Sequence, residues 1–415
     1  MNLRTIIWLP VMLFLTGCQL PLLAMEGPLP TLAAVAEAPT VTPLAAAQSG
    51  IPPTWTPPPA TAEPTATPTV PVLTLSPTNT PLPIPTSTPI TPTPTPSITP
   101  TPTLTPTATL RPIDQYSLHE PLPLELYPRP PNDNGWGMHW IPTVSQDRAT
   151  VDRFVTELVR MHIKWVVFLN DGTNIGRNDY LVDRLVANGI MPVMRLYRSG
   201  ILPYDGDLGP MVRHYRARGV YYYQLYNEPN INDENHQGFA NPNQYAIAWA
   251  ASAREVINNG GYPGIGALSP GGQYDHYAFL DRTIQALRWN GDAGLLNRSW
   301  LSVHNYHGLR PFDDPHGFLL FRNYDEIVRH HLQFSMPMIG TEAGSYSQDP
   351  LVEKQHLIRQ YSYMRDAEPY FFAHSHWLLA NLEGGSADPT WEWQTLFRSG
   401  FVHPVVTEFF YRNRR

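Results

Sequence analysis

The sequence has 415 residues, a formal net charge of −7 and an isoelectric point near 6.1. This mildly acidic chain has no basic block of the kind that nucleic-acid binding needs, so we expect no nucleic-acid partner. Cys18 is the single cysteine, which excludes an intrachain disulfide and a cysteine-based metal site.

An apolar run at the N-terminus has the features of an export signal. Arg4 precedes residues 6–15, which are apolar, and the run is too short to span a membrane as a mature helix. Its ending, LTGC at residues 15–18, resembles the lipobox of bacterial lipoproteins. The resemblance implies that residues 1–17 are a signal peptide and that Cys18 becomes a lipidated N-terminus, which anchors the protein to the outer face of a membrane. A plain secretory signal with a stray cysteine is the alternative.

Residues 18–113 have the composition of an unstructured spacer. Residues 19–50 are rich in Ala, Pro and Leu, and residues 51–110 are Thr/Pro low complexity with Glu63 as the single charged residue. Such a segment cannot bury a core and favours the extended polyproline II conformation. We therefore predict a disordered linker that holds the following domain away from the cell envelope.

Residues 114–415 alternate short apolar or β-branched runs with amphipathic segments. Eight strands are expected, and they begin near Trp136, Lys164, Met191, Val220, Ile265, Trp300, Met336 and Phe371. The alternation predicts a parallel sheet, and eight units predict closure into a (β/α)₈ TIM barrel, which takes about 250 residues. A doubly wound open sheet is the main alternative, although no glycine-rich phosphate loop follows any expected strand.

Polar and aromatic residues stand where several of these strands are expected to end. They are Asn227 and Glu228 after the fourth strand, His304 and Tyr306 after the sixth, Glu342 after the seventh and Trp377 after the eighth. A closed barrel brings the carboxyl ends of its strands into one crater, so Glu228 and Glu342 are expected to face each other. Two opposed carboxylates are the minimal equipment for glycoside hydrolysis, because one protonates the leaving oxygen while the other attacks the anomeric carbon.

In these motifs the chain resembles a glycoside hydrolase of clan A, the retaining (β/α)₈ enzymes that include family 5 cellulases and mannanases and family 39 enzymes. The Asn-Glu-Pro motif at residues 227–229 matches the clan's strand-four ending, and PMIGTEAG at residues 337–344 matches its strand-seven ending. The resemblance implies that Glu228 is the acid/base, that Glu342 is the nucleophile and that Asn227 binds the sugar 2-hydroxyl.

The same resemblance implies roles for further residues. His304-Asn305-Tyr306 matches the His-x-Tyr ending of strand six in many family 5 members, whose Tyr hydrogen-bonds the nucleophile. Trp377 resembles the strand-eight Trp that floors the subsite beside the cleaved bond. Family 5 barrels usually carry an Arg at the end of strand two, and the second strand here has none. Arg195 on the third strand is the candidate replacement, and its alternative is pairing with a structural acid.

The main candidates also have ordinary structural alternatives. Glu228 before a proline could be a solvated turn residue, and Glu342 could cap a helix. Tyr306 and Trp377 could be core residues. Four strand-end matches in the right order favour the catalytic interpretation.

Aromatic side chains elsewhere supply further candidates for sugar stacking. Trp136 and His139 on the first strand are predicted to contact substrate. Other tryptophans that could stack on sugars, although each is more often a packing residue, are Trp140, Trp289 and Trp391.

Histidines near the strand ends raise the question of a metal site. The residues concerned are His304, His307, His374 and His376. His374 and His376 are two apart on a strand and share a face, so they could chelate a metal. No carboxylate-rich metal motif accompanies them, and we predict neither a metal nor another cofactor.

The sequence thus predicts an exported, lipid-anchored retaining glycoside hydrolase that acts as a monomer on a β-linked poly- or oligosaccharide. A non-catalytic glycan-binding lipoprotein and a transglycosylase that remodels envelope glycans are the alternatives. The presence of both glutamates and Asn227 argues against the first alternative. The second passes through the same glycosyl ester, so the sequence does not separate it from a hydrolase.

Overall fold

The computed structural model describes residues 111–413 of the chain. The predicted signal peptide, the lipidation site Cys18 and nearly all of the predicted linker lie outside the described residues. Within residues 111–413, no helix combines the length and the apolar character needed to cross a membrane.

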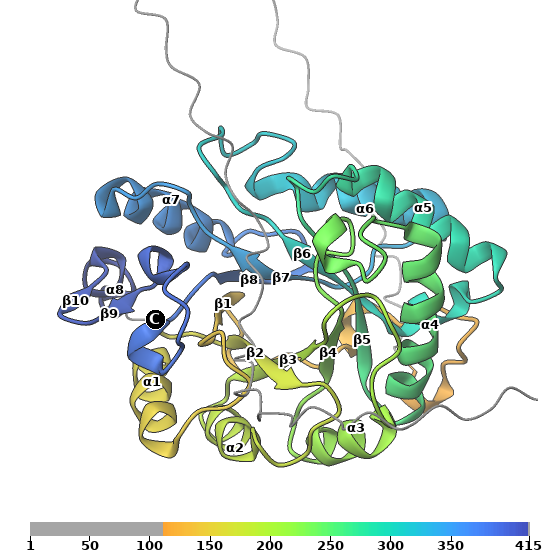
Figure 1. Ribbon diagram of the computed structural model, residues 1–415, viewed down its shortest axis with the longest axis horizontal. Helices are drawn as coiled ribbons and strands as arrows, with labels where there is room; N and C mark the ends of the chain where they lie inside the picture. Colours follow the sequence, from red (N-terminus) through yellow and green to blue (C-terminus); the bar gives the residue numbers. More distant parts are fainter. Residues whose placement is uncertain (1–110, 414–415) are drawn as a thin grey trace, which may run out of the picture. The chain divides into compact units, whose positions relative to one another are not determined.

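Eight parallel strands close into a barrel in chain order, with β1 paired to both β2 and β8 (Figure 1). The strands are β1 (Trp136–His139), β2 (Trp165–Asp171), β3 (Met191–Tyr197), β4 (Tyr222–Leu225), β5 (Tyr262–Leu268), β6 (Trp300–His304), β7 (Met338–Ala343) and β8 (Phe371–His376). Closure confirms the predicted (β/α)₈ barrel and rules out the doubly wound open sheet. The carboxyl ends of the strands therefore meet at one mouth.

β5 begins earlier than the sequence predicts. It starts at Tyr262 rather than near Ile265, because Pro263 and Gly264 belong to the strand instead of interrupting it. Glycine suits this position, since a Cβ atom on Gly264 would lie 2.5 Å from an indole carbon of Trp300. Gly264 therefore allows close packing against Trp300 inside the barrel.

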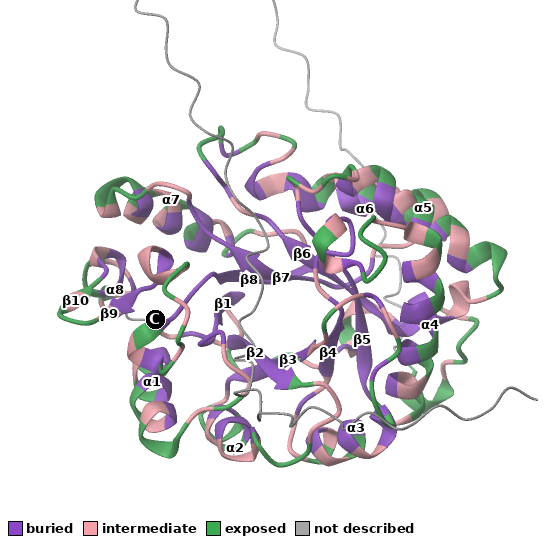
Figure 2. Ribbon diagram, in the orientation of Figure 1, coloured by how far each residue is buried: buried purple, intermediate pink, exposed green. Residues whose placement is uncertain are grey.

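Helices surround the barrel, with buried residues toward the strands and exposed residues toward solvent (Figure 2). They are α1 (Arg148–Arg160), α2 (Asp179–Ala187), α3 (Leu208–Ala217), α4 (Pro242–Asn258), α5 (His276–Trp289), α6 (Phe321–Leu332), α7 (Pro350–Tyr363) and α8 (Pro404–Glu408). The buried residues of α1 recur at helical spacing and are Val151, Phe154, Val155 and Leu158. Asp147 caps this helix by accepting from the Thr150 N–H at 3.0 Å.

Short elements complete the described chain. The 3₁₀ helices are η1 (Ile113–Gln115), η2 (Leu124–Leu126), η3 (Asn232–Glu234), η4 (Ala293–Arg298), η5 (Phe318–Leu320), η6 (Leu382–Gly384), η7 (Glu392–Gln394) and η8 (Phe410–Arg412). A two-stranded antiparallel pair, β9 (Phe397–Arg398) and β10 (Phe401–Val402), precedes α8.

Large side chains fill the barrel below the mouth. This core includes Trp165, Val167, Val193, Tyr222, Trp300 and Phe372. The segment before β1 covers the amino-terminal ends of the strands, where the Tyr127 hydroxyl donates to the carbonyl of Ser299 at 3.2 Å. Arg298 donates to the carbonyls of Tyr116 and Glu120 in the same segment. Because this segment closes the amino-terminal end of the barrel, the opposite end is the one where polar side chains can meet a ligand.

Candidate active site

The chain turns sharply after β4. This strand stops at Leu225, and Tyr226 and Glu228 both have positive φ angles, of 64° and 37°. Non-glycine residues adopt this region at an energetic cost, so their surroundings must hold them there. The Tyr226 N–H donates to the hydroxyl of Tyr204 at 3.0 Å, and the Glu228 N–H donates to the carbonyl of Ala267 at 2.9 Å. These bonds fix the turn that presents Glu228 at the mouth.

Two carboxylates and a histidine form the centre of the mouth. Nδ1 of His304 lies 2.9 Å from Oε1 of Glu228 and 3.7 Å from Oε2 of Glu342. One ligand atom from each of the three residues lies within 4.8 Å of the other two. All three side chains are at most 5% exposed. The barrel therefore brings together the two glutamates that the strand ends predicted.

Glu342 on β7 is held by two donors. The guanidinium of Arg195 on β3 donates to its Oε1, and the Tyr306 hydroxyl donates to its Oε2 at 3.0 Å. Burial by itself would raise the pKa of Glu342, but the neighbouring His304 and Arg195 outweigh burial and lower this pKa below the ordinary value. Glu342 is therefore the ionised member of the pair. Arg195 on β3 contacts it, as expected of a replacement for the arginine that the second strand lacks.

Glu228 has the opposite tendency. Burial raises the pKa of Glu228, and the charge of Glu342 raises it further, while the hydrogen bond with His304 opposes both effects. Its second oxygen, Oε2, is buried and has no hydrogen-bond partner within the described chain. Two carboxyl groups that share one site with pKa values pushed apart can act as an acid and as a nucleophile.

A third carboxylate, which no sequence motif indicates, adjoins this pair. Glu234 of η3 accepts a hydrogen bond from Nδ2 of Asn227 at 3.3 Å. Burial and the charge of Glu228 raise the pKa of Glu234 to about 7. The stretch that follows Pro229 is rich in Asn and Asp, which is typical of a solvated turn, so its composition carried no signal of a partly buried acid.

His139 and Trp377 line the mouth where β1 meets β8. Their ring centroids lie 4.2 Å apart in an edge-on arrangement, and Trp377 is 5% exposed. Burial lowers the pKa of His139 to about 3, while the charge of Glu342 opposes this shift. His139 is therefore a neutral imidazole within electrostatic reach of Glu342. The peptide bond between Trp377 and Leu378 is cis.

Trp136 lies away from this group, which contradicts the expectation that it contacts substrate. It is the first residue of β1, at the end opposite the mouth, and its indole N–H donates to the carbonyl of Tyr361 at 2.9 Å. Its ring packs against Phe409 and Phe410. Trp136 is therefore a packing residue between the barrel and its outer layer.

The other tryptophans fall into three different environments. Trp140 is fully buried and donates from its indole to Gln146. Trp289 is 90% exposed at the end of α5. Trp391 is partly buried, and its ring centroid lies 6.1 Å from that of Trp377. Of these three, Trp391 is the one that the structure places beside the mouth.

Several buried polar atoms around the two glutamates have no hydrogen-bond partner among residues 111–413. They are Nε2 of His139, Oδ1 of Asn227, Oε2 of Glu228, Nε2 of His304 and Nε1 of Trp377. Buried polar groups are normally paired, so such a concentration identifies a place where a polar ligand can complete the hydrogen bonding.

In the part of the chain that the structure describes, the group with metal-ligand spacing is Glu228, His304 and Glu342. The guanidinium of Arg195 already binds Glu342, and this positive charge opposes a divalent cation. His374 and His376 do not converge on a common point. The first lies between Phe318 and Tyr361, and His376 points Nε2 at the carbonyl of Gln394, 2.9 Å away.

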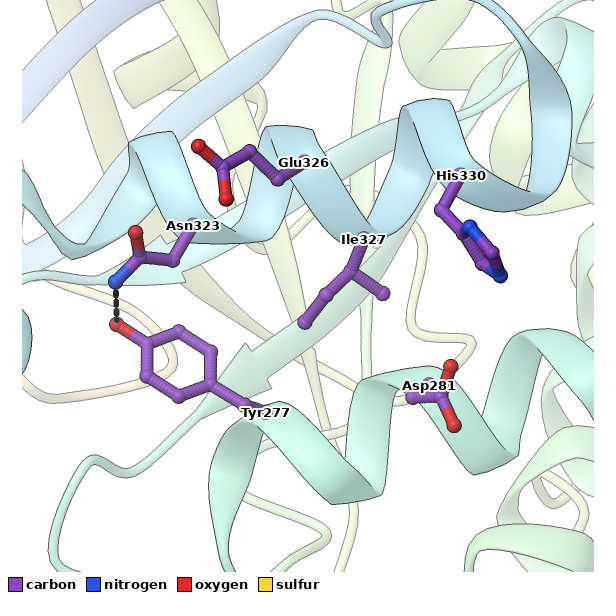
Figure 3. A pocket seen from close by; sticks show the side chains of 6 residues that line it. All are labelled: Tyr277, Asp281, Asn323, Glu326, Ile327 and His330. Atoms are coloured by element: carbon purple, nitrogen blue, oxygen red, sulfur yellow. Dashed lines mark hydrogen bonds between the residues drawn. The ribbon is translucent and has the colours of Figure 1, made fainter.

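A separate hollow lies on the outer helical layer, between α5 and α6 (Figure 3). The residues that line it are Tyr277, Asp281, Asn323, Glu326, Ile327 and His330. The Asn323 amide donates to the hydroxyl of Tyr277 at 2.8 Å. This hollow lies on the surface between helices and does not share residues with the mouth.

No family model matches the sequence, and no curated protein matches it. Among solved structures, a family 39 glycoside hydrolase from Bacteroides cellulosilyticus WH2 is 15% identical over 67% of this chain, with a TM-score of 0.48. This alignment spans 62% of the length of the family 39 structure.

Two further solved structures are aligned over nearly their whole length. A family 128 endo-β-1,3-glucanase from Sorangium cellulosum is 15% identical, with a TM-score of 0.44, over 67% of this chain and 99% of that one. A triple mutant of an endo-β-1,4-glucanase from Xanthomonas axonopodis pv. citri is 12% identical, with a TM-score of 0.45, over 67% and 99%. At this level of likeness, the fold assignment rests on the strand pairing of the chain itself.

Proposed function

We propose that this protein is a retaining glycoside hydrolase that cleaves a β-linked poly- or oligosaccharide. The observation that carries the proposal is the pair Glu228 and Glu342, two buried carboxyl groups at one barrel mouth whose pKa values are shifted in opposite directions. One is suited to give a proton and the other to attack as an anion. The orphaned polar atoms around them suit a ligand rich in hydroxyl groups.

The spacing of the pair supports a retaining mechanism. An oxygen of Glu228 lies within 4.8 Å of an oxygen of Glu342. Retaining glycosidases place their two carboxyl groups about 5–5.5 Å apart, whereas inverting enzymes need about 6.5–9.5 Å to admit a water molecule. The shorter spacing leaves Glu342 in position to attack the anomeric carbon itself.

In the first step, Glu228 donates its proton to the glycosidic oxygen while Glu342 attacks the anomeric carbon. The bond between that carbon and the leaving oxygen breaks, and an ester forms between the sugar and Glu342. Arg195 and Tyr306 keep Glu342 ionised and oriented for the attack. Asn227 is placed to contact the sugar beside the reacting carbon, as the clan A resemblance implies.

In the second step, Glu228 changes from an acid to a base. Glu228 is now an anion that takes a proton from water, and the water oxygen attacks the anomeric carbon. The ester bond breaks, Glu342 is released as a carboxylate, and the sugar leaves with its original configuration. Neutral His139 and Trp377 can hold the sugar ring without competing for these protons.

The test is incubation of the full-length protein with β-glucans, mannans, xylans and galactans, with product sizes measured by chromatography. Proton NMR of the first product determines its anomeric configuration, and we expect the β-anomer. An α-anomer as the first product would overturn the retaining mechanism, and failure to cleave any β-linked glycan or aryl β-glycoside would overturn the hydrolase proposal.

We further propose that the protein is exported and anchored by lipid at Cys18, with residues 19–113 as a spacer. The lipobox-like ending at residues 15–18 and the Thr/Pro repeats, which carry a single charge at Glu63, support this proposal. Replacement of Cys18 by Ser should release the protein from membranes or leave it uncleaved, because only a thiol accepts the diacylglyceryl group. Fatty-acid labelling of the Ser variant equal to that of the native protein would contradict lipidation at Cys18.

A further inference from the structure

We propose that the loops after β2, β3 and β4 form a sugar-binding arm that holds a second sugar of the same glycan chain next to the catalytic glutamates. The arm consists of residues 171–174, residues 197–199, Asp205 and residues 233–234. The inference rests on the proposed glycosidase function and extends it, because it specifies that the substrate is a chain of more than one sugar.

Two hollows adjoin each other along this arm. The inner hollow is lined by groups that include Arg195, Asn227 and Glu234, and the outer hollow by groups that include Asn174 and Asp205. They share Tyr197, Arg198 and Ser199. Because Arg195 bonds Glu342 and Asn227 precedes Glu228, the inner hollow begins directly beside the catalytic pair.

The two hollows differ in size, so they can hold different parts of a sugar. The inner hollow has a volume of about 20 Å³, which is room for a hydroxyl group or one water molecule. The outer hollow has a volume of about 550 Å³, within the range of small-molecule sites and ample for a sugar ring. A ring in the outer hollow can therefore extend one hydroxyl toward the carboxylate of Glu234.

The polar groups of the arm are suited to sugar hydroxyls. Nε of Arg198 and Oδ1 of Asn174 are buried and have no hydrogen-bond partner within the described chain. One is a donor and the other an acceptor, and a hydroxyl group can satisfy both types. These unpartnered atoms are independent of those around Glu228 and Glu342.

The charges of the outer hollow favour an uncharged ligand. Arg198 pairs with Asp205 at 2.9 Å, and Asp171 pairs with Arg177 at 3.1 Å. Because each charge already has a partner of opposite sign, neither a cationic nor an anionic sugar gains a free counter-charge in this hollow. The neutral hydroxyl-rich rings of common β-glycans fit it better.

Tyr197 supplies an aromatic surface where the two hollows meet. It is the last residue of β3, it is half-buried, and Asp171 of β2 is its partner across the sheet. A tyrosine ring with a partly exposed face can stack on the apolar face of a sugar. The arm thus combines a stacking surface with a donor and an acceptor, as a carbohydrate site requires.

The test measures binding of gluco-, manno- and xylo-oligosaccharides of one to six sugars by isothermal titration calorimetry. The full-length protein carries Glu228→Gln so that the ligand stays intact. We expect affinity to rise as the chain lengthens from one sugar, and Tyr197→Ala in this background to lower the affinity for the longer ligands about tenfold. The affinity for single sugars should change less than about twofold, and Tyr197→Phe should bind like its parent.

Two further variants serve as a second test of the arm and as a control. Ser199→Trp blocks the arm from an exposed position and should produce the same selective loss, so a folding defect of the alanine variant does not decide the test. Trp289→Ala, at an exposed tryptophan outside the arm, should bind all ligands like its parent. Equal affinity of the parent, Tyr197→Ala and Ser199→Trp for the longer ligands would overturn the arm, and so would the absence of any gain with chain length.

Hydrolysis of an aryl β-monoglycoside separates this test from the proposed function. The native protein should cleave this single-sugar substrate, since hydrolysis of one sugar needs the catalytic pair and does not need the arm. If the native protein cleaves no glycoside, the hydrolase proposal fails, and the binding comparison still decides whether the arm holds sugar.

Discussion

Two buried glutamates in this barrel have a histidine beside them but different surroundings. Glu228 lies next to His304 at the mouth, and Glu353 on α7 lies 3.2 Å from Nε2 of His403. Burial raises the pKa of both glutamates, that of Glu353 to about 7. A raised pKa and a nearby imidazole are therefore common to a catalytic candidate and to a residue packed behind the sheet.

The difference lies in the partner groups. The charge that opposes ionisation of Glu228 is a second carboxylate, Glu342, whose own pKa is lowered. The charged groups that act on Glu353 are His376 and Arg398, and both favour its ionised form. Catalytic acid chemistry needs a nucleophile beside the acid, so the pair of opposite shifts is more informative than any single shift.

The largest effect is expected at Glu342. Glu342→Ala removes the attacking oxygen, so turnover should fall by at least about 10⁴-fold on every cleaved substrate. Added azide can enter the vacated side and should yield a glycosyl azide of inverted configuration, identified by NMR. Glu353→Gln is the matched control. It should keep turnover within about threefold of the native rate, because it changes no side chain at the mouth. Equal losses in both variants would remove the contrast between the two sites.

Glu228→Ala should have a large effect that depends on the leaving group. On natural glycans, loss of the proton donor should reduce turnover by about 10²–10⁴-fold. An activated aryl glycoside needs little protonation, so the ester on Glu342 should still form and accumulate. Azide should then intercept the ester and give a product of retained configuration. A product of inverted configuration from this variant would reverse the two assignments.

The pH dependence of kcat/KM should sharpen the comparison further. The pKa of Glu342 is lowered, so activity should fall at acidic pH, below the ordinary glutamate range, when this group takes up a proton. The pKa of Glu228 is raised, so activity should also fall above the ordinary range, when this group loses its proton. In Glu228→Ala, the alkaline limb should disappear for an activated aryl glycoside. Its persistence would assign the proton donor to another group.

A smaller effect, on stability rather than rate, is expected at Glu353. Its pKa of about 7 in the folded state exceeds the ordinary value of 4.5. Between pH 4.5 and about pH 7, the folded state therefore keeps a proton on Glu353 that the unfolded state has released. Stability from this group therefore falls as pH rises through that window. Glu353→Gln should remove the decline, so its stability relative to the native protein should be higher at pH 8 than at pH 5, by on the order of 1–3 kcal/mol.

Denaturant unfolding at the two pH values measures this difference. Glu408→Gln, at an exposed partner of Lys354, is the control, and its lowered pKa places its titration below the window. An unchanged difference between Glu353→Gln and the native protein at both pH values would show that Glu353 is already ionised in the folded state.

The barrel and its two central glutamates were predictable because strand–helix alternation and strand ends are local patterns. In a closed parallel barrel, the end of each strand is a point in a common crater, so Glu228 and Glu342 could be placed together despite their separation in sequence. Arg195 was predictable only as one of two alternatives. Its contact with Glu342 depends on the register of β3 across the barrel, and no local pattern records this register.

Trp136 and Glu234 show where local patterns stop being informative. All four residues of β1 are buried, so alternation could not show which side chains face inward, and Trp136 was expected to contact substrate although it begins the strand. Glu234 owes its partial burial to the path of the loop after Pro229. Loop paths depend on tertiary contacts, and a short polar stretch gives no indication of them.

The segment that seals the barrel floor also determines where the chain enters the domain. Residues 116–127 contact Arg298 and Ser299, just before β6, on the face opposite the mouth. A tether that arrives through this segment attaches to the floor of the domain. If the protein is anchored as we propose, the tether joins the domain on the face opposite the mouth.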